Sequence, residues 1–474
     1  MSKLLGQGLY ELDLRSLALL RICVGLLICL DILSRSRYLL AHYTDQGVIP
    51  REELLHMEPL KFSLYLAGGG AVYVGFLFLV TLALGVALTL GFHTRVSTFL
   101  CWFLMLSLHF RNPVVLNSGD VLLRMLLFWG FFLPWGNVWS VDKKEKTTFQ
   151  SPRIRTLGST GYFVQIMVVY VFAALLKSGD SWHDGTAIYY ALNLDHFSTD
   201  LAKWVLEFPD LLYYLTLGVY YFEAFVWLFF VSPIFHGPLR TLGVLLLGLF
   251  HIGIALHLHL GMFSLIAVFS AVGLLPSWFW EQLGKRTHWK CLSLQEHTSD
   301  SPTTIAHRAS ETLAGLSLLL VLLWNVHSLD STDLELPRTI HTIAHISGLD
   351  QKWSMFAPFP LVDDGWYVAE GILKNGKSVE LLRNQELTWE KPGSVSTTYP
   401  SQRWRKYMIN LYSKDFAGYR APFLHYLAHK WNQNHRGPWE VEEIKLYYML
   451  ERTLPPQEEF KVEKLLLETY PEKR

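Results

Sequence analysis

Ionisable residues interrupt several apolar runs of this 474-residue sequence, and they are the first candidates for chemistry. Lys177 follows the apolar run 161–176 and precedes Ser178-Gly179-Asp180. A lysine at such a boundary between hydrocarbon and water either snorkels to a headgroup or belongs to a site. Desolvation in a low-dielectric pocket would let it act as a base near neutral pH. The position alone favours snorkelling, so the rest of the chain must decide.

Other ionisable groups lie inside the remaining apolar runs, where each needs a partner or a polar cavity. They are Arg21, Asp31, Asp120, Arg124, Glu223, His251, His257 and His259. Asp120 and Arg124 are four residues apart, so we expect them to pair on one helix face, as a structural bridge or as pocket residues. Several polar groups fall near the outer ends of their helices, whereas Arg124, Glu223 and His251 lie nearer mid-depth. The outer groups are Asp31, Asn117, Asp120, Lys177, His257 and His259. This layer predicts a polar pocket that opens on one side of a membrane.

The sequence contains no P-loop, no GxGxxG after a strand, no GxSxG elbow and no HExxH. His257 and His259 point about 200° apart on a helix, so we expect no shared metal ion and favour structural, hydrogen-bonded histidines. The four cysteines lack metal spacing and are expected to be buried thiols. No metal site is predicted.

Composition sets the class of protein. Hydrophobic residues make up 51% of the chain and charged residues only 17%, which is typical of a polytopic membrane protein embedded in a lipid bilayer. Lys+Arg and Asp+Glu balance at 41 each, so nothing in the net charge indicates nucleic acid binding.

Apolar runs long enough to cross a bilayer predict about nine transmembrane helices within residues 1–330. Their expected ranges are 15–34, 69–91, 95–111, 119–136, 160–177, 210–232, 240–260, 262–281 and 311–329. The seventh and eighth should form a tight hairpin at Leu260-Gly261. The first helix has no short apolar region with a cleavage site, so we expect a retained anchor.

The basic residues indicate the orientation. With the N-terminus cytoplasmic, thirteen Lys and Arg residues fall in inner loops and six in short outer loops, as the positive-inside rule requires. The outer side then holds the segments 36–62 and 186–208, which we expect to lie along the membrane surface, and the C-terminal domain. The polar loop 285–310 reads as a cytoplasmic linker.

Residues 331–474 have the composition of a small α+β domain outside the membrane. Asn375-Gly376 between two half-apolar runs predicts a β-hairpin. The stretches 401–414 and 421–433 are expected to be helical, and 439–454 to contain a strand. The predicted fold is therefore an α-helical polytopic membrane protein with a C-terminal α+β extramembrane domain.

Five strings, in order and at compatible spacing, carry a resemblance to a known family. They are DLRSLALLRICVGLLICLD at 13–31, LGFHTR at 90–95, VWSVD at 138–142, YVFAALLKSGDSW at 170–182 and FHIGIALHLHLGMFS at 250–264. Over about 330 residues the chain resembles the vitamin K-dependent gamma-carboxylases and the bacterial membrane proteins that share their HTTM domain. WSMF at 353–356 and RWRKY at 403–407 resemble the family's outer domain more loosely.

The resemblance implies an activity. Lys177 falls on the lysine regarded as the family's catalytic base, which takes a proton from reduced vitamin K or another quinol. Oxygen and carbon dioxide are the co-substrates; the products are the quinone epoxide and γ-carboxyglutamate in a Glu-containing peptide or protein. A lyase of this kind would use a pocket, for which the candidate residues are His251, Asn137, Asn117, Asp120, Arg124, Glu223 and His257.

Two departures from the family keep a second hypothesis open. Family carboxylases carry a histidine just before the WSVD string, where this chain has Asn137. The chain also lacks most of the outer β-rich region that recognises the propeptide. The alternative is a non-catalytic membrane protein that binds a lipid or quinone or acts as a scaffold; a transporter is disfavoured because no inverted repeat is found. The family's distribution favours a bacterial inner membrane over the endoplasmic reticulum.

Overall fold

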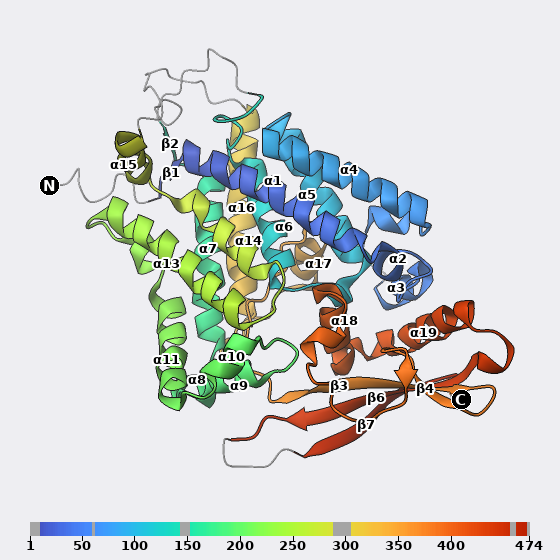
Figure 1. Ribbon diagram of the computed structural model, residues 1–474. Coiled ribbons are helices and arrows are strands. Elements are labelled where there is room, and N and C mark those ends of the chain that lie inside the picture. Colours follow the sequence, from blue (N-terminus) through green and yellow to red (C-terminus); the bar gives the residue numbers. More distant parts are fainter. Residues whose placement is uncertain (1–9, 59–61, 143–151, 288–304, 456–460, 472–474) are drawn as a thin grey trace.

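The computed structural model describes residues 10–58, 62–142, 152–287, 305–455 and 461–471. Long helices form a bundle, and a small sheet with two helices lies at one end of it (Figure 1). Most of the predicted linker 285–310, together with Cys291, falls outside the described residues. Of the other cysteines, Cys23 and Cys101 are buried as expected, whereas Cys29 is half-buried.

Among the described residues, six helices are long and apolar enough to cross a membrane. They are α1 (Leu14–Ser36), α4 (Ala71–Leu90), α7 (Leu157–Leu176), α11 (Pro209–Phe225) continued by α12 (Leu228–Val231), α13 (His236–His257) and α16 (Ile305–His327). Most of α1 and α7 is buried, whereas only a third or less of α4, α11, α13 and α16 is buried. Exposed apolar helices suit contact with lipid and not with water.

Two of the nine predicted spanning helices form inside the bundle but do not have the length or apolarity of a span. These are α5 (Thr94–Arg111), which ends with His109 and Arg111, and α6 (Ser118–Phe132), which has 15 residues. Both are largely buried, with α5 packed between α4 and α6 and α6 against α7. Helices that face protein need not be apolar all round. The described residues thus contain six candidate spans, or seven if a bent pair counts as one, and the number nine is not confirmed.

The predicted eighth helix, 262–281, is wrong as one continuous element. The chain forms α14 (Phe263–Ser270) and a short 3-10 turn, then bends by 89° into α15 (Ser277–Thr287). Pro276 has no N–H for a helix to use, so carbonyls before it need other partners. Arg240 Nε donates to Leu274 O at 2.7 Å and Ser16 Oγ donates to Leu275 O at 2.6 Å. The predicted turn before α14 is confirmed, with Gly261 at φ +65°.

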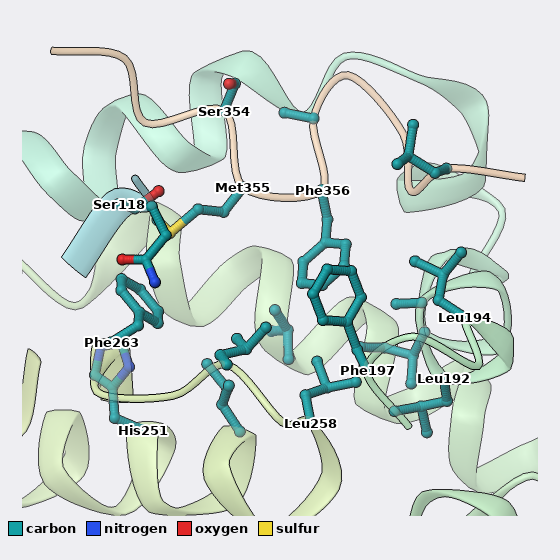
Figure 2. Close-up of a pocket in the computed structure, with 18 of the residues that line it drawn as sticks. Ser118, Leu192, Leu194, Phe197, His251, Leu258, Phe263, Ser354, Met355 and Phe356 are labelled. Atoms are coloured by element: carbon teal, nitrogen blue, oxygen red, sulfur yellow. The ribbon is translucent and has the colours of Figure 1, made fainter. Parts of the chain in front are cut away.

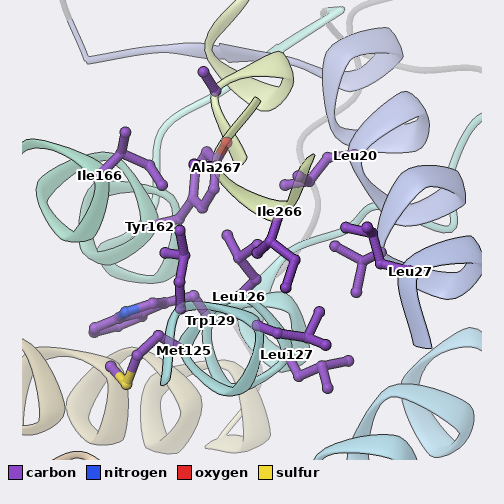
Figure 3. Close-up of a cluster of buried hydrophobic side chains, with 14 of the residues drawn as sticks. Leu20, Leu27, Met125, Leu126, Leu127, Trp129, Tyr162, Ile166, Ile266 and Ala267 are labelled. Carbon is purple, nitrogen blue, oxygen red and sulfur yellow. The ribbon is translucent and has the colours of Figure 1, made fainter. Parts of the chain in front are cut away.

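The core lies where α1, α6, α7 and α14 meet. Figure 3 shows the apolar side chains that converge there: Leu20, Leu27, Met125, Leu126, Leu127, Trp129, Tyr162, Ile166, Ile266 and Ala267. On the opposite face of α1, Gly25 lets α4 approach closely, because a Cβ at Gly25 would lie 2.3 Å from Thr89 Oγ1.

Short helices at the sheet end of the bundle occupy the two segments that were expected to be interfacial. The first segment holds α2 (Leu39–Tyr43) and α3 (Arg51–Met57). The second segment begins after α8 (Asp180–His183) and holds α9 (Ala187–Asn193) and α10 (Asp200–Val205). Both lie between the bundle and the sheet (Figure 1). At the opposite end, the two-residue strands β1 (Leu12–Asp13) and β2 (Arg153–Ile154) pair.

The C-terminal region is an antiparallel sheet covered by two helices. The strand order is β5-β4-β3-β6-β7, formed by β3 (Asp363–Leu373), β4 (Ser378–Glu380), β5 (Gln385–Glu386), β6 (Val441–Arg452) and β7 (Val462–Tyr470). The helices α18 (Gln402–Tyr412) and α19 (Arg420–Asn434) share an apolar core with the sheet. The predicted hairpin, both helices and the 439–454 strand are confirmed; β7 and α17 (Arg338–Ser347) were not predicted.

Candidate functional site

A cavity of about 450 Å³ lies between the helix bundle and the C-terminal region (Figure 2). Its walls come from α7, α11, α13 and α14 on one side and from α18 and the segment 354–361 on the other. Most of the lining is apolar, as with Val169, Leu258 and Phe263, and Phe356 extends into it from the C-terminal region. A small set of polar side chains interrupts this surface.

Lys177 is the central polar group. It is the C-cap of α7 and only 2% exposed, so its amine does not reach the surface as a snorkelling lysine would. Nζ donates to Glu223 Oε2 at 2.5 Å and to Ala173 O at 3.3 Å, and it lies 4.9 Å from the centroid of the Trp182 ring. The amine is thus held between a carboxylate, a helix carbonyl and an aromatic face.

The loop after Lys177 is tied to the C-terminal region. Gly179 N donates to Pro358 O at 3.0 Å, and Trp182 Nε1 donates to Phe356 O at 3.0 Å. Ser178-Gly179 breaks the helix, which lets the chain turn Trp182 back over the amine of Lys177. The position of Lys177 therefore depends on residues more than 170 positions away.

A second polar pair lies in the same wall. Tyr170 Oη and His251 Nε2 are 2.9 Å apart, and His251 packs against Phe263 with ring centroids 5.5 Å apart. Both side chains are buried. His251 Nδ1 is buried and has no hydrogen-bond partner among the described residues. A buried ring nitrogen without a partner is costly, so a ligand group that bonded to it would be favoured.

A comparison with known protein families identifies the family of this chain. The family model of the HTTM domain matches residues 10–278. The chain belongs to the HTTM domain family. These are membrane domains associated with vitamin K epoxide reductases and carboxylases. Together with the six apolar helices of the described residues, the match indicates an integral membrane protein. Neither the curated proteins nor the solved structures contain a match to the chain.

The HTTM match includes all bundle residues of the cavity but stops before α16 and the C-terminal region. Four of the predicted site residues line the cavity: Asn117, Lys177, Glu223 and His251. The side chain of Asn117 also caps α6, accepting from Gly119 N at 2.8 Å. The sequence predicts that Glu223 lies nearer mid-depth than Lys177, whereas the structure brings the two side chains into contact.

Asp120 and Arg124 lie outside this lining and do not share the expected bridge. Asp120 pairs with Arg35 and with Arg403 of α18, each at 2.5 Å, and Arg403 Nη2 also donates to Asp31 at 2.8 Å. Arg124 pairs with Asp350 at 3.3 Å. Charges from the C-terminal region compete successfully for these partners, so Asp120 belongs to an ion network that joins that region to the bundle.

Two further candidates also lie away from the cavity lining. Asn137 follows the opposite end of α6 from Asn117, and the 15-residue helix between them is about 22 Å long. His257 Nδ1 is 2.8 Å from Gly253 O within its own helix, and the neighbouring His259 lines the cavity instead. Among the described residues, no group of three or more metal-ligating side chains is close enough to hold a metal ion.

Sequence reasoning missed several lining residues. Tyr170 precedes Lys177 by seven residues, two helical turns on one face, and that spacing could have identified it. Gln402, Arg405 and Lys406 of α18 also line the cavity. The only signal for the two basic residues was the RWRKY string at 403–407. Burial lowers the pKa of Lys406, and the pKa of Arg405 is also lowered by burial.

The arrangement can exchange a proton inside an apolar space. Nζ of Lys177 and Oε2 of Glu223 are close enough to share one proton, either as ammonium and carboxylate or as neutral amine and carboxylic acid. Burial narrows the free-energy difference between the ionic and the neutral form of the pair, because both ions lose hydration. A neutral amine at the cavity wall could then accept a proton from a bound molecule.

Proposed function

We propose that this protein is a vitamin K-dependent gamma-carboxylase-like membrane enzyme that oxidises a reduced quinone, with Lys177 as the base. The observation that carries the proposal is the buried amine of Lys177 at the wall of an otherwise apolar cavity, paired with Glu223. Family membership supports the same assignment, since Lys177 lies in the string YVFAALLKSGDSW.

The cavity residues fit a quinol, reduced vitamin K or another. The cavity volume of about 450 Å³ lies within the usual range of small-molecule pockets, about 300–1,000 Å³. Apolar walls suit a hydrophobic ring, and the partnerless Nδ1 of His251 could bond to a ring oxygen. When bound, a quinol supplies an acidic hydroxyl and an oxidisable ring.

The protein's own residues would then take one proton from the bound hydroxyl in two transfers. Glu223 accepts the proton of the Lys177 ammonium, and the neutral amine takes a proton at Nζ from the bound hydroxyl. Trp182 covers the amine on one side and, with Phe356, limits access of water. Tyr170 fixes the ring of His251 through its 2.9 Å contact, which orients Nδ1.

The co-substrates oxygen and carbon dioxide, and a Glu-containing peptide, belong to the same proposal. We place the C-terminal region outside the cell and the N-terminus in the cytoplasm of a bacterium. The course of α1 supports placing the N-terminus and the C-terminal region on opposite sides of the membrane. Asp13 at its start accepts from Ser277, whereas Asp31 near its end accepts from Arg403 of the C-terminal region. The peptide would approach from the C-terminal side of the cavity.

The test is epoxide formation by the purified protein in nanodiscs with reduced vitamin K and oxygen. We expect product from the wild type, loss of at least 100-fold in Lys177→Met, and unchanged product in Lys203→Met, which removes an exposed lysine of α10. Epoxide formation that survives Lys177→Met would refute the base. Quinone binding without any epoxide in the wild type would favour the non-catalytic quinone- or lipid-binding alternative.

A further inference from the structure

A second cavity, of about 290 Å³, lies within the C-terminal region and is separate from the first. It is lined by β3, α18, α19, the chain after β4 and the segment 392–400, with α2 at its border. The two cavities share no lining residue. The proposed oxidation of a quinol makes no use of it.

Seven of the seventeen residues that line it are aromatic. They are Tyr38, Trp366, Tyr367, Tyr399, Trp404, Phe423 and Tyr426. Aliphatic side chains such as Leu381 and Met408 fill the gaps between them. Ring faces and edges in this density suit a flat apolar body that can stack or meet them edge-on.

The charge of the lining has one sign. Arg383 and Lys430 line the cavity, and no Asp or Glu among the described residues does; Glu380, which is not in the lining, pairs with Arg383 at 3.4 Å. An adjoining cavity of about 380 Å³ shares Tyr38, Ala41, Tyr426 and Lys430 with it and adds Arg37 and His429. Its described lining also contains no carboxylate. A site whose charged lining residues are both cations disfavours a cationic ligand and attracts an anion.

Two hydrogen-bond donors of this wall are buried without partners in the described part of the chain. They are Trp366 Nε1, on a side chain that is 4% exposed, and Arg383 Nη2. Glu380 accepts from the backbone N–H of Arg383 at 2.6 Å and from its Nε at 3.4 Å, which fixes the guanidinium but leaves Nη2 unused. Neither an indole N–H nor a guanidinium can accept, so what is missing is an oxygen acceptor.

We propose that this cavity binds a small aromatic carboxylate. The ring system would lie among the aromatic side chains, and the carboxylate would accept from Arg383 Nη2 and Trp366 Nε1. Its volume is at the lower end of the range for small-molecule pockets, which suits two fused rings and not a two-chain lipid. Satisfying two buried donors and the positive charge together gives the acid its advantage over a neutral analogue.

The test measures binding of 2-naphthoate and of the uncharged 2-naphthalenemethanol to the full-length protein in nanodiscs, with empty nanodiscs subtracted. We expect the wild type to bind the acid at least 10-fold more tightly than the alcohol. Arg383→Gln should lower the affinity for the acid at least 10-fold and leave that for the alcohol unchanged. Trp366→Phe, which keeps an aromatic ring and removes the N–H, should weaken the acid several-fold.

Arg436→Gln is the matched control, because it removes one exposed positive charge of the same region outside the lining. It should change neither affinity. Equal binding of acid and alcohol to the wild type overturns the proposal, as does an unchanged affinity for the acid in both Arg383→Gln and Trp366→Phe. Epoxide formation should be the same in Arg383→Gln as in the wild type, so failure at this site is distinct from failure at Lys177.

Discussion

A buried histidine–aspartate pair joins the segment between α9 and α10, beside the first cavity, to the sheet. Replacing either partner should make the stability of the protein depend on pH, in opposite directions for the two variants. His196 lies between α9 and α10 and is 5% exposed; Asp364 lies on β3 and is 2% exposed. His196 Nε2 and Asp364 Oδ1 are 3.0 Å apart. Burial raises the pKa of Asp364 from 3.8 to about 7 and lowers the pKa of His196 from 6.5 to about 4.

Other groups around the pair are neutral or lie at its edge. Tyr448 Oη is 3.1 Å from Nε2 of the histidine, and Tyr399 Oη is 3.1 Å from its Nδ1. Asp195 donates its backbone N–H to Asp364, and Lys391 contacts both Asp195 and Glu451. Asp195 raises the pKa of the histidine, while Arg405 and Lys391 lower it. None of these outweighs desolvation, which is the largest cause for both members of the pair.

The signs follow from which state holds more protons. Between pH 3.8 and 7 folded Asp364 keeps a proton that the unfolded chain has lost, so its contribution to stability falls as pH rises. Between pH 4 and 6.5 folded His196 lacks a proton that the unfolded chain holds, so its contribution rises with pH. At about 1.4 kcal/mol per pKa unit, the two contributions amount to about 4 and about 3 kcal/mol. In the wild type they nearly cancel from pH 4 to 6.5.

Single variants remove the cancellation. Asp364→Asn leaves the histidine alone, and its stability should rise between pH 4.5 and 6.5; His196→Gln leaves the carboxyl alone, and its stability should fall over the same range. The double variant His196→Gln/Asp364→Asn reports the pH dependence of all other groups and is the baseline. The apparent melting temperature in detergent is followed by tryptophan fluorescence. Its change between pH 4.5 and 6.5 should differ between the two single variants by about 5 °C or more. Parallel slopes in all four proteins would refute the assigned shifts.

Two predictions concern packing and charge in the bundle. Arg403→Met should destabilise the protein by about 3–5 kcal/mol because it leaves the buried carboxylates of Asp31 and Asp120 without one of their cations; a melting temperature equal to that of the wild type would contradict this network. Gly25→Val should lower the melting temperature by several degrees, whereas Gly75→Val on α4 should not, since a Cβ there meets nothing within 4 Å. Equal effects of the two glycine substitutions would show that α1 and α4 can separate without cost.

The sequence predicted those elements whose signals are local. Apolar runs located α1, α4, α7 and α13 to within a few residues, and Asn375-Gly376 located the β3–β4 hairpin. Intramembrane polarity likewise selected Lys177, Glu223 and His251, which the fold brings to one cavity. Each of these signals depends on side chains near one another in the chain or on the cost of a charge in hydrocarbon, and neither needs knowledge of distant partners.

What could not be predicted depends on partners far apart in the sequence. The break between α14 and α15 is stabilised by Ser16, 259 residues away from the carbonyl that it satisfies. Asp120 and Arg124 had the spacing of a helical ion pair, but Arg403 lies 283 residues from Asp120 and provides two contacts. An i,i+4 pair is worth only about 0.5 kcal/mol. A bidentate arginine in a buried network readily displaces it.

The depth of Glu223 shows why the cavity depends on more than the HTTM domain. If α7 and the helix formed by α11 and α12 crossed the bilayer side by side at the same depth, Lys177 would lie at the end of its helix and Glu223 nearer the middle of the bilayer. In the structure the first half of α11 stands beside the short helices that follow Lys177, where Thr216 Oγ1 accepts from Ile188 N at 3.1 Å. This shift brings Glu223 level with the end of α7. The space beyond α7 is then closed by the segment 354–361 and by α18, both outside the HTTM match. The HTTM domain therefore supplies the amine and its carboxylate, and the C-terminal region supplies the wall that keeps them buried.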